Sequence, residues 1–213
     1  MERIVRVLLL SLLVFGYLPH VKAQHGIDYK WLRTINYNRD DEFDGFMNGV
    51  SNSMFTVSAA LPISQLIIGY ASGNHTTIRN GWTTVGALAV SYAATTAMKE
   101  SFRRDRPYMN HPELNTAQSG NSPSFPSGHT STAFACAAAL SLEYPKWYVI
   151  APSFAWAGAV GYSRMYLGRH YPSDVFVGAI IGSGSAYLSY KLNKWIDGKH
   201  RRSSSSLTPV PLF

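Results

Sequence analysis

The chain has 213 residues, which is enough for one domain with a core of its own. Charged residues make up only 15% of the sequence, and its 13 Tyr, 10 Phe and 5 Trp exclude an intrinsically disordered protein. The single cysteine excludes a disulfide scaffold and a zinc or iron–sulfur site built from cysteines. The 19 Lys and Arg residues outnumber the 12 Asp and Glu residues, and the resulting net charge of +7 predicts an anionic partner.

The first residues are typical of a secretory signal peptide. Arginines precede the apolar run Val7–Leu18, and the small or aliphatic stretch that follows ends in a predicted cleavage site before Gln24. We therefore interpret residues 1–23 as a signal peptide, with an uncleaved N-terminal anchor helix as the alternative. In both cases the chain is expected to emerge on the non-cytoplasmic side of the membrane.

Five later segments contain no Asp, Glu, Lys or Arg and are long enough to be helices. They are rich in Ala, Gly and Ser, which let helix backbones approach closely, and none alternates apolar and polar residues as a strand would. We predict an all-α, membrane-embedded helical bundle of about five to six helices with the active site at one membrane face. A soluble helical bundle remains the alternative, because the later segments are short for a bilayer span. The predicted helices are Met54–Gly73, Trp82–Met98, His129–Leu142, Trp147–Tyr162 and Val175–Tyr190.

The remaining charges divide the chain into regions. Residues 24–190 are predicted to form the helical-bundle domain, and residues 191–213 a basic, Ser-rich, disordered tail. The tail carries five Lys and Arg residues against one acid, Asp197, and such an excess is typical of a cytoplasmic segment. With that orientation, the polar loops 99–128 and 163–174 lie together on the outer side of the membrane.

These two loops hold three polar motifs. The first motif runs from Lys99 to Arg106-Pro107, and the second is Pro126-Ser127-Gly128-His129. The third is Ser163-Arg164, followed after five residues by His170 and after three more by Asp174. Since all three motifs fall on one side of the predicted bundle, we expect them to form a single composite site.

The first two motifs have the chemistry of a phosphate-binding site. Lys99 and Arg106 lie two helical turns apart, so they are predicted to point from one helix face. Arginine offers a planar fork for phosphate oxygens, and lysine offers a point charge. Ser127 is predicted to cap a helix whose first backbone N–H groups, unobstructed at Gly128, can bind an anion.

The two histidines add groups for catalysis. His170 and Asp174 lie four residues apart around Pro172, which is typical of a first helical turn. The carboxylate can then hold one imidazole nitrogen and leave the other to attack, while His129 can act as an acid. Spacing alone does not decide which histidine has which role. Among the other residues, Arg103, Arg104 and Arg169 are interpreted as solvated neighbours, and Cys136 as a buried apolar residue.

Taken together, the three motifs resemble the signature of the type 2 phosphatidic acid phosphatase superfamily over residues 50–190. That superfamily includes membrane lipid phosphatases, soluble class A acid phosphatases and vanadium haloperoxidases. The resemblance implies an α-helical bundle that hydrolyses phosphomonoesters or pyrophosphates without a metal ion or other cofactor. It also implies that His170 forms a phosphohistidine, that Asp174 orients it and that His129 protonates the leaving group. The implied phosphate-binding residues are Lys99, Arg106, Ser127, Gly128 and Arg164.

The expected function is therefore hydrolysis of a lipid phosphate in the envelope of a bacterium, by an integral membrane protein with a periplasm-facing site. The resemblance implies phosphatidic acid, phosphatidylglycerol phosphate, undecaprenyl pyrophosphate or a lipid A phosphate as substrate. The main alternative is a soluble periplasmic acid phosphatase of the class A kind, and a haloperoxidase or a non-catalytic membrane scaffold are further alternatives. The bilayer and the lipid phosphate are the expected partners. We expect no nucleic acid and no obligatory protein partner, because the basic residues fall in the phosphate motifs and the tail.

Overall fold

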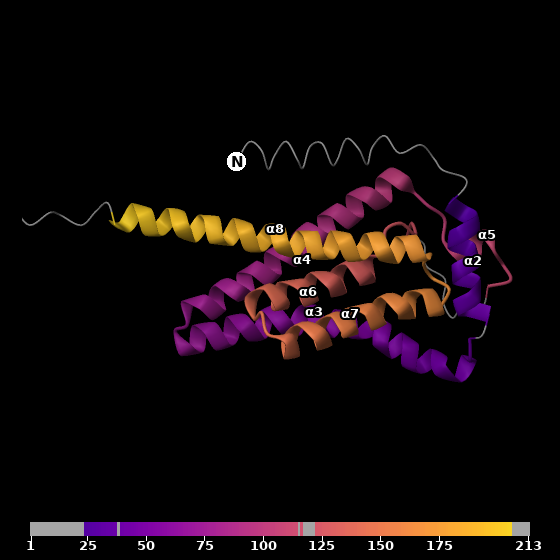
Figure 1. Ribbon diagram of the computed structural model, residues 1–213, viewed down its shortest axis with the longest axis horizontal. Coiled ribbons are helices and arrows are strands. Elements are labelled where there is room, and N and C mark those ends of the chain that lie inside the picture. The colour runs from indigo at the N-terminus through magenta and orange to yellow at the C-terminus, as the bar shows by residue number, and fades with distance from the viewer. Residues whose placement is uncertain (1–23, 38, 115, 117–121, 206–213) are drawn as a thin grey trace, which may run out of the picture.

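The computed structural model describes residues 24–37, 39–114, 116 and 122–205, and every regular element within these ranges is a helix (Figure 1). Five long helices form a bundle, and one shorter helix crosses its end, which confirms the all-α prediction. The predicted signal peptide, residues 1–23, lies outside the described residues. The elements are α2 (Gln24–Tyr37), η1 (Asp41–Phe43), α3 (Asp44–Ser72), α4 (His75–Phe102), α5 (Pro107–Asn110), α6 (Gly128–Glu143), α7 (Trp147–Tyr166) and α8 (Pro172–Ser205).

Most helix ends lie beyond their predicted limits, although α3 ends one residue before the predicted Gly73 and α7 begins at the predicted Trp147. α3 ends where Gly73 adopts the left-handed conformation with a φ of 65°, and Asn74 caps α4 by accepting hydrogen bonds from Thr76 N and Thr77 N. The predicted change to a disordered tail at residue 191 is not what the structure contains, since α8 continues to Ser205. Lysine and arginine end an apolar pattern but favour a helix, so the charges there do not stop it. Residues 206–213 lie outside the described part of the chain.

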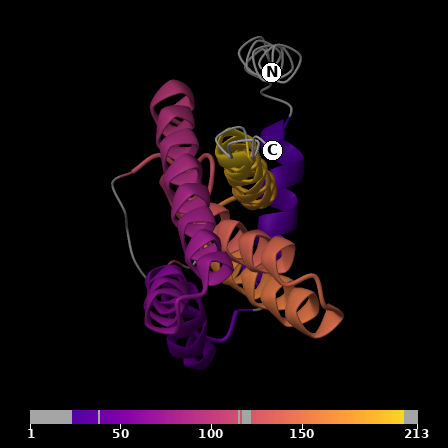
Figure 2. The same cartoon turned by 90° about the vertical axis from the view of Figure 1, so that its left-hand side faces the viewer.

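The centre of the bundle is α6, which contacts α3, α4, α7 and α8 (Figure 2). Its buried side chains are almost all small, and Cys136, 1% exposed, is among them as predicted. α8 approaches so closely that a Cβ atom at Gly182 would lie 2.1 Å from the Ser131 carbonyl oxygen. Small residues therefore bring the beginnings of α6 and α8 together, and these beginnings carry two of the three motifs.

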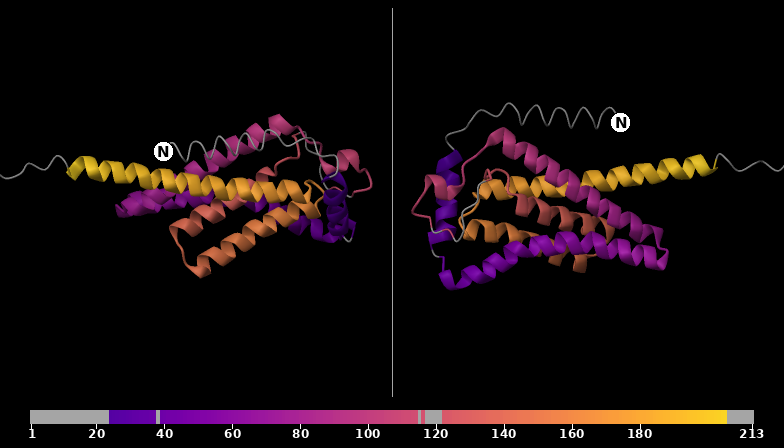
Figure 3. Two further views of the ribbon diagram at one scale, coloured as in Figure 1. Left: turned by 45° about the horizontal axis from the view of Figure 1, so that its top comes forward. Right: turned by 180° about the vertical axis from the view of Figure 1, so that it is seen from behind.

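α2 lies across the end of the bundle at which α7 ends and α8 begins (Figures 1 and 3). Its residue Leu32 is completely buried and packs in one cluster with Leu114 and Tyr171. Asn36, 4% exposed, donates to the Tyr166 carbonyl oxygen at 3.0 Å. α2 is thus fixed to the bundle beside the third motif.

One stretch among the described residues, 41–72, is long and apolar enough to cross a membrane, with a mean hydropathy of 1.5. Only 22% of its apolar window is buried within the protein. Phe55, Ile63 and Ile67 are each more than half exposed, which is unfavourable in water. The second predicted segment of near-spanning length, Trp82–Met98, does not reach the same apolar level, because α4 carries several buried hydroxyl side chains.

Candidate active site

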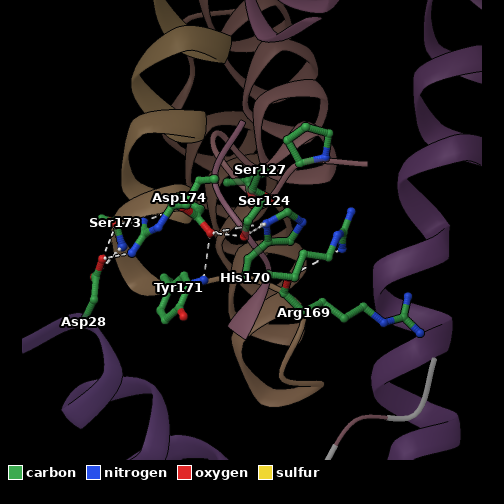
Figure 4. A network of polar contacts seen from close by, with 12 residues as sticks. Asp28, Ser124, Ser127, Arg169, His170, Tyr171, Ser173 and Asp174 are labelled. Carbon is green, nitrogen blue, oxygen red and sulfur yellow. Dashed lines mark hydrogen bonds and ion pairs between the residues drawn. The ribbon is translucent and has the colours of Figure 1, made fainter. Parts of the chain in front are cut away.

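The three motifs meet at the end of the bundle crossed by α2. The Ser127 N–H donates to the Asp174 carbonyl oxygen at 3.0 Å, which joins the beginning of α6 to the beginning of α8. The N–H groups of Arg169 and His170 both donate to the Arg164 carbonyl oxygen, at 3.0 and 3.3 Å, and so fold the loop between α7 and α8 back onto α7. The second and third motifs therefore lie side by side at this end of the bundle (Figure 4).

Lys99 and Arg106 both lie at this site, but the backbone between them is not the predicted helix. They do not share a helix face, because α4 ends at Phe102 and Arg103 takes a left-handed φ of 43°. Arg106 precedes Pro107, which disfavours helical geometry, and its backbone is extended with φ −74° and ψ 154°. The prediction that Lys99 and Arg106 point from one helix face was wrong, yet the two cations remain close enough to influence each other's charge.

Each of these two cations is held by the loop that precedes α6. Lys99 Nζ donates to the Pro123 carbonyl oxygen. Arg106 Nε donates to the Ser122 carbonyl oxygen at 2.8 Å, and its Nη2 donates to the Ser122 hydroxyl at 2.9 Å. Burial lowers the pKa of the Arg106 guanidinium, which nevertheless stays protonated because arginine starts far above neutral pH. The site thus keeps two positive charges out of bulk water.

Arg164 is the most deeply buried cation of the site, with a side chain only 3% exposed. Its Nη1 donates to the Ser51 hydroxyl on α3 at 2.7 Å. Its Nε has no hydrogen-bond partner among the described residues, and a buried guanidinium N–H without a partner is costly. Arg106 and Arg169 lie close enough to repel it, so an anion placed among these residues would be stabilised by all of them.

His170 is 2% exposed and stands before the first turn of α8, as predicted. Its Nδ1 lies 3.6 Å from Asp174 Oδ2 and 3.4 Å from the Ser124 hydroxyl. Because Nδ1 faces these groups, Nε2 is the nitrogen left to face a substrate. Burial lowers the pKa of His170 to about 3, so the ring is neutral at physiological pH and can act as a nucleophile.

Asp174 is fully buried and is held on both carboxylate oxygens. Oδ1 accepts from Arg104 Nη1 at 2.7 Å. Oδ2 accepts from the Ser124 hydroxyl at 2.5 Å and from the Tyr171 N–H at 2.9 Å. These bonds allow little rotation, so the carboxylate is aimed at Nδ1 of His170.

The second motif begins α6 as predicted, with Ser127 at the N-cap position. Its hydroxyl accepts from Thr130 Oγ1 at 2.9 Å and does not cap the backbone, which differs from the expected use of this side chain. A Cβ atom at Gly128 would have only Thr95 Cγ2 within 4 Å, at 3.8 Å, so the space beside the helix start is open. His129 packs edge-on against Phe55 of α3 and is an electrostatic neighbour of Arg164 and His170.

Two arginines that the sequence presented as solvated neighbours belong to the site instead. Arg104 is 17% exposed and pairs with Asp174, and Arg169 is 8% exposed and donates to Asn48 Oδ1 at 2.9 Å. Arg103, 76% exposed, is the one that faces outward. Consecutive arginines in a loop give no signal of which one turns inward. Ser124 was also missed, since nothing in a Ser- and Pro-rich stretch distinguishes the serine that bonds to Asp174.

All three motifs lie in a segment that matches the model of one known protein family. A family model described as the PAP2 superfamily matches residues 80–197. The chain is 27% identical over 188 residues to an undecaprenyl-diphosphatase of Sulfolobus acidocaldarius, an alignment that covers 87% of this chain and 88% of that protein. It is also 43% identical over 76 residues to a lipid A 1-phosphatase of Porphyromonas gingivalis. That alignment covers 34% of this chain and only 17% of the phosphatase.

The fold also resembles a solved structure. The first transmembrane PAP2 type phosphatidylglycerolphosphate phosphatase from Bacillus subtilis superimposes with a TM-score of 0.69 and 24% sequence identity. The superposition covers 89% of this chain and 96% of that one. At this level of identity the likeness concerns the fold, and it extends over nearly the whole bundle.

Proposed function

The chain belongs to the PAP2 superfamily, and from that premise we propose that it is a phosphoric ester hydrolase that cleaves a lipid phosphate monoester or pyrophosphate through a phosphohistidine on His170. The observation that carries the proposal is the group of buried cations beside a neutral, buried histidine. Arg164 Nε has no partner among the described residues, and a phosphate oxygen would supply one. Lys99 and Arg106 lie within electrostatic range of Arg164 and add to the positive field.

In the first step, His170 Nε2 attacks the phosphorus atom, an N–P bond forms, and the bond from phosphorus to the lipid oxygen breaks. Burial and the neighbouring Arg164 lower the pKa of His129 while the site holds no anion. A bound phosphate offsets that positive field, so His129 takes up a proton as the substrate binds and gives it to the departing oxygen, which leaves as the lipid alcohol or phosphate. The imidazole becomes cationic when it takes the phosphoryl group, and the negative charge of Asp174 near Nδ1 stabilises it. Lys99, Arg106 and Arg164 stabilise the charge on the non-bridging oxygens, which is the largest catalytic contribution expected in phosphoryl transfer.

In the second step, a water molecule attacks the phosphorus atom from the side opposite His170. His129, now neutral, takes a proton from that water, the N–P bond breaks, and phosphate leaves with His170 restored. The two steps balance without an external oxidant, reductant or second substrate. Backbone N–H groups of the first turn of α6, at Gly128 beside the Ser127 cap, are placed to assist in binding the oxygens.

A lipid substrate is favoured over a small soluble ester by the surroundings of the site. α3, which supplies Ser51 and Phe55 to the site, carries the apolar surface that is long enough to span a membrane. An apolar hollow of about 350 Å³ also borders Pro172 and Val175 in the first turn of α8, the turn that carries Asp174. The names of the similar proteins point to polyprenyl and lipid A phosphates. We accordingly place the protein in the membrane of a bacterial envelope, with the site facing the periplasm.

The test is phosphate release by the detergent-extracted full chain in EDTA. Phosphatidic acid, phosphatidylglycerol phosphate, undecaprenyl pyrophosphate and lipid A would be offered beside para-nitrophenyl phosphate. We expect one lipid to be hydrolysed much faster than the small ester, and His170→Ala to lose turnover by about 10⁴-fold or more while its melting temperature stays near that of the wild type.

Three results would contradict the proposal. Near-wild-type activity in His170→Ala would refute the assignment of the nucleophile. Preference for para-nitrophenyl phosphate, together with release of the protein from membranes by osmotic shock, would favour a soluble acid phosphatase. No release from any substrate would overturn the proposed hydrolysis. Trapping of a phosphorylated protein that is stable in alkali and labile in acid would identify the phosphohistidine directly.

A further inference from the structure

The crossing helix α2 contributes a carboxylate to the network behind Asp174 (Figure 4). Asp28 of α2 has a side chain only 11% exposed, although it lies 145 residues before its partner Ser173. Its Oδ1 accepts from the Ser173 backbone N–H at 3.0 Å, and its Oδ2 accepts from the Ser173 hydroxyl. The N-terminal segment, which contains none of the three motifs, therefore bonds directly to the turn that carries Asp174.

Asp28 supplies the hydrogen-bond acceptor that the N-terminus of α8 lacks. The residue before Pro172 is Tyr171, whose side chain is not of the kind that caps a helix. Pro172 has no N–H, so the first backbone donor of α8 is that of Ser173, and Asp28 accepts from it. A carboxylate at this position also interacts favourably with the positive end of the helix dipole. Asp28 thus caps α8 from another helix and fixes the orientation of its first turn.

Arg104 joins Asp28 to Asp174. Its Nη2 donates to Asp28 Oδ2 at 2.9 Å, and its Nη1 donates to Asp174 Oδ1 at 2.7 Å. The guanidinium lies 4.0 Å from the centre of the Tyr171 ring, which restricts its rotation. One partly buried guanidinium is therefore shared between two carboxylates, one on α2 and the other beside His170.

We propose that Asp28 is a positioning residue for the hydrolysis, an inference that rests on the proposed function. Asp28 acts through Arg104 and Ser173, which together keep Asp174 in register with Nδ1 of His170. Asp28 also neutralises part of the positive charge of Arg104. Without Asp28, Arg104 pairs with Asp174 alone and neutralises more of its negative charge. Asp174 then stabilises the cationic form of the His170 ring less well.

The experiment compares Asp28→Asn with wild type in the full chain, using phosphatidic acid in detergent micelles and the lipid that the wild type hydrolyses fastest. We expect kcat to fall by about 10- to 100-fold, because a small displacement of a catalytic group has an effect of this size. KM should stay within a factor of about two, since Asp28 does not touch the phosphate. Asp28→Glu should restore part of kcat, and the matched control Asp41→Asn, on a side chain 75% exposed, should leave it unchanged.

A double-mutant cycle separates positioning from general stabilisation. If Asp28 acts through Asp174, then Asp28→Asn has little further effect on kcat in an Asp174→Asn background, whereas independent effects multiply. If Asp28→Asn fails to fold, Ser173→Ala removes one hydroxyl from the same network and should also lower kcat at constant KM. Unchanged kcat in a folded variant, or multiplying effects in the cycle, would overturn the inference. An inactive wild type would instead overturn the proposed function.

Discussion

Two of the buried polar clusters among the described residues lie toward opposite ends of the bundle, and they differ in how their groups are paired. At the end away from α2, Gln65 Nε2 donates to Glu143 Oε2 at 2.6 Å, and Thr84 Oγ1 donates to Gln65 Oε1 at 2.9 Å. This cluster ties α3, α4 and α6 together, and its side chains satisfy one another. At the α2 end, Lys99, Arg106 and Arg164 are drawn together in spite of their like charges.

The difference indicates which cluster serves stability and which serves chemistry. A cluster with matched donors and acceptors lowers the free energy of the folded state without a ligand. A cluster with surplus cations and an unpartnered N–H raises that free energy until an anion arrives. Substitutions at the two ends should therefore have separable effects, on turnover at one end and on stability at the other.

After the loss already expected for His170→Ala, the largest effect is expected at His129, the proposed acid. His129→Gln should lower kcat on a lipid phosphate by about 10²- to 10⁴-fold, since an alkoxide leaves slowly without a proton. The loss should be much smaller for para-nitrophenyl phosphate, because para-nitrophenolate leaves without protonation. Phosphate release on both substrates checks this, with His75→Gln at an exposed position of α4 as the control. An equal loss on the two substrates would contradict the assignment of His129 as the acid.

A somewhat smaller effect is expected at Arg164. Arg164→Lys keeps the charge but loses the planar fork, including the Nε donor, so kcat/KM should fall by about 10²- to 10³-fold. Inorganic phosphate should also inhibit the variant less strongly than the wild type. The matched control is Arg103→Lys, since that side chain is 76% exposed and should tolerate the change. Equal inhibition of Arg164→Lys and wild type by phosphate would place the anion elsewhere.

The dependence of stability on pH should report the burial of His170. Its pKa is lowered to about 3 in the folded protein, so between that value and its usual range near 6.5 the unfolded chain binds more protons. The contribution of neutral His170 is present above pH 6.5 and is lost as the pH falls towards 3. At pH 4.5 the wild type should have lost about 2–3 kcal/mol that His170→Ala does not lose. Melting temperatures of both proteins at pH 7.5 and 4.5 test this, and equal acid sensitivity would contradict it.

Sequence reasoning succeeded where the relevant contacts are local. The order His170, Pro172 and Asp174 predicted one helix start, because proline geometry acts within a few residues. The second motif predicted another start at Gly128 in the right place, although the Ser127 hydroxyl does not cap the backbone as expected. The convergence of the motifs followed from the alternation of apolar and polar segments. The roles of the individual site residues stay predictions until the variants are measured.

The same reasoning failed where the outcome depends on contacts between distant segments. Whether Arg103 or Arg104 turns inward is decided by Asp28 and Asp174, which lie 76 residues before and 70 residues after Arg104. The end of α4 was missed because a left-handed arginine has no signature in the sequence, unlike a left-handed glycine such as Gly73. Ser124 and Asp28 are ordinary polar residues by composition. Their importance comes from the carboxylate and the helix start that the fold brings beside them.

The smallest effect on turnover is expected in the cluster of Gln65, Glu143 and Thr84, at the end of the bundle away from α2. A change there tests directly whether the two clusters have separate roles. Gln65→Leu removes the donor to Glu143 and the acceptor of Thr84, so it should lower the free energy of unfolding by about 1–3 kcal/mol. kcat and KM should stay within about twofold of wild type, because distant sites act independently. Ser64→Ala, at an exposed neighbour on α3, serves as the control for both melting temperature and phosphate release. A large loss of kcat in a stably folded Gln65→Leu would mean that the two ends are linked through α6, and that the far cluster helps to hold the catalytic residues in place.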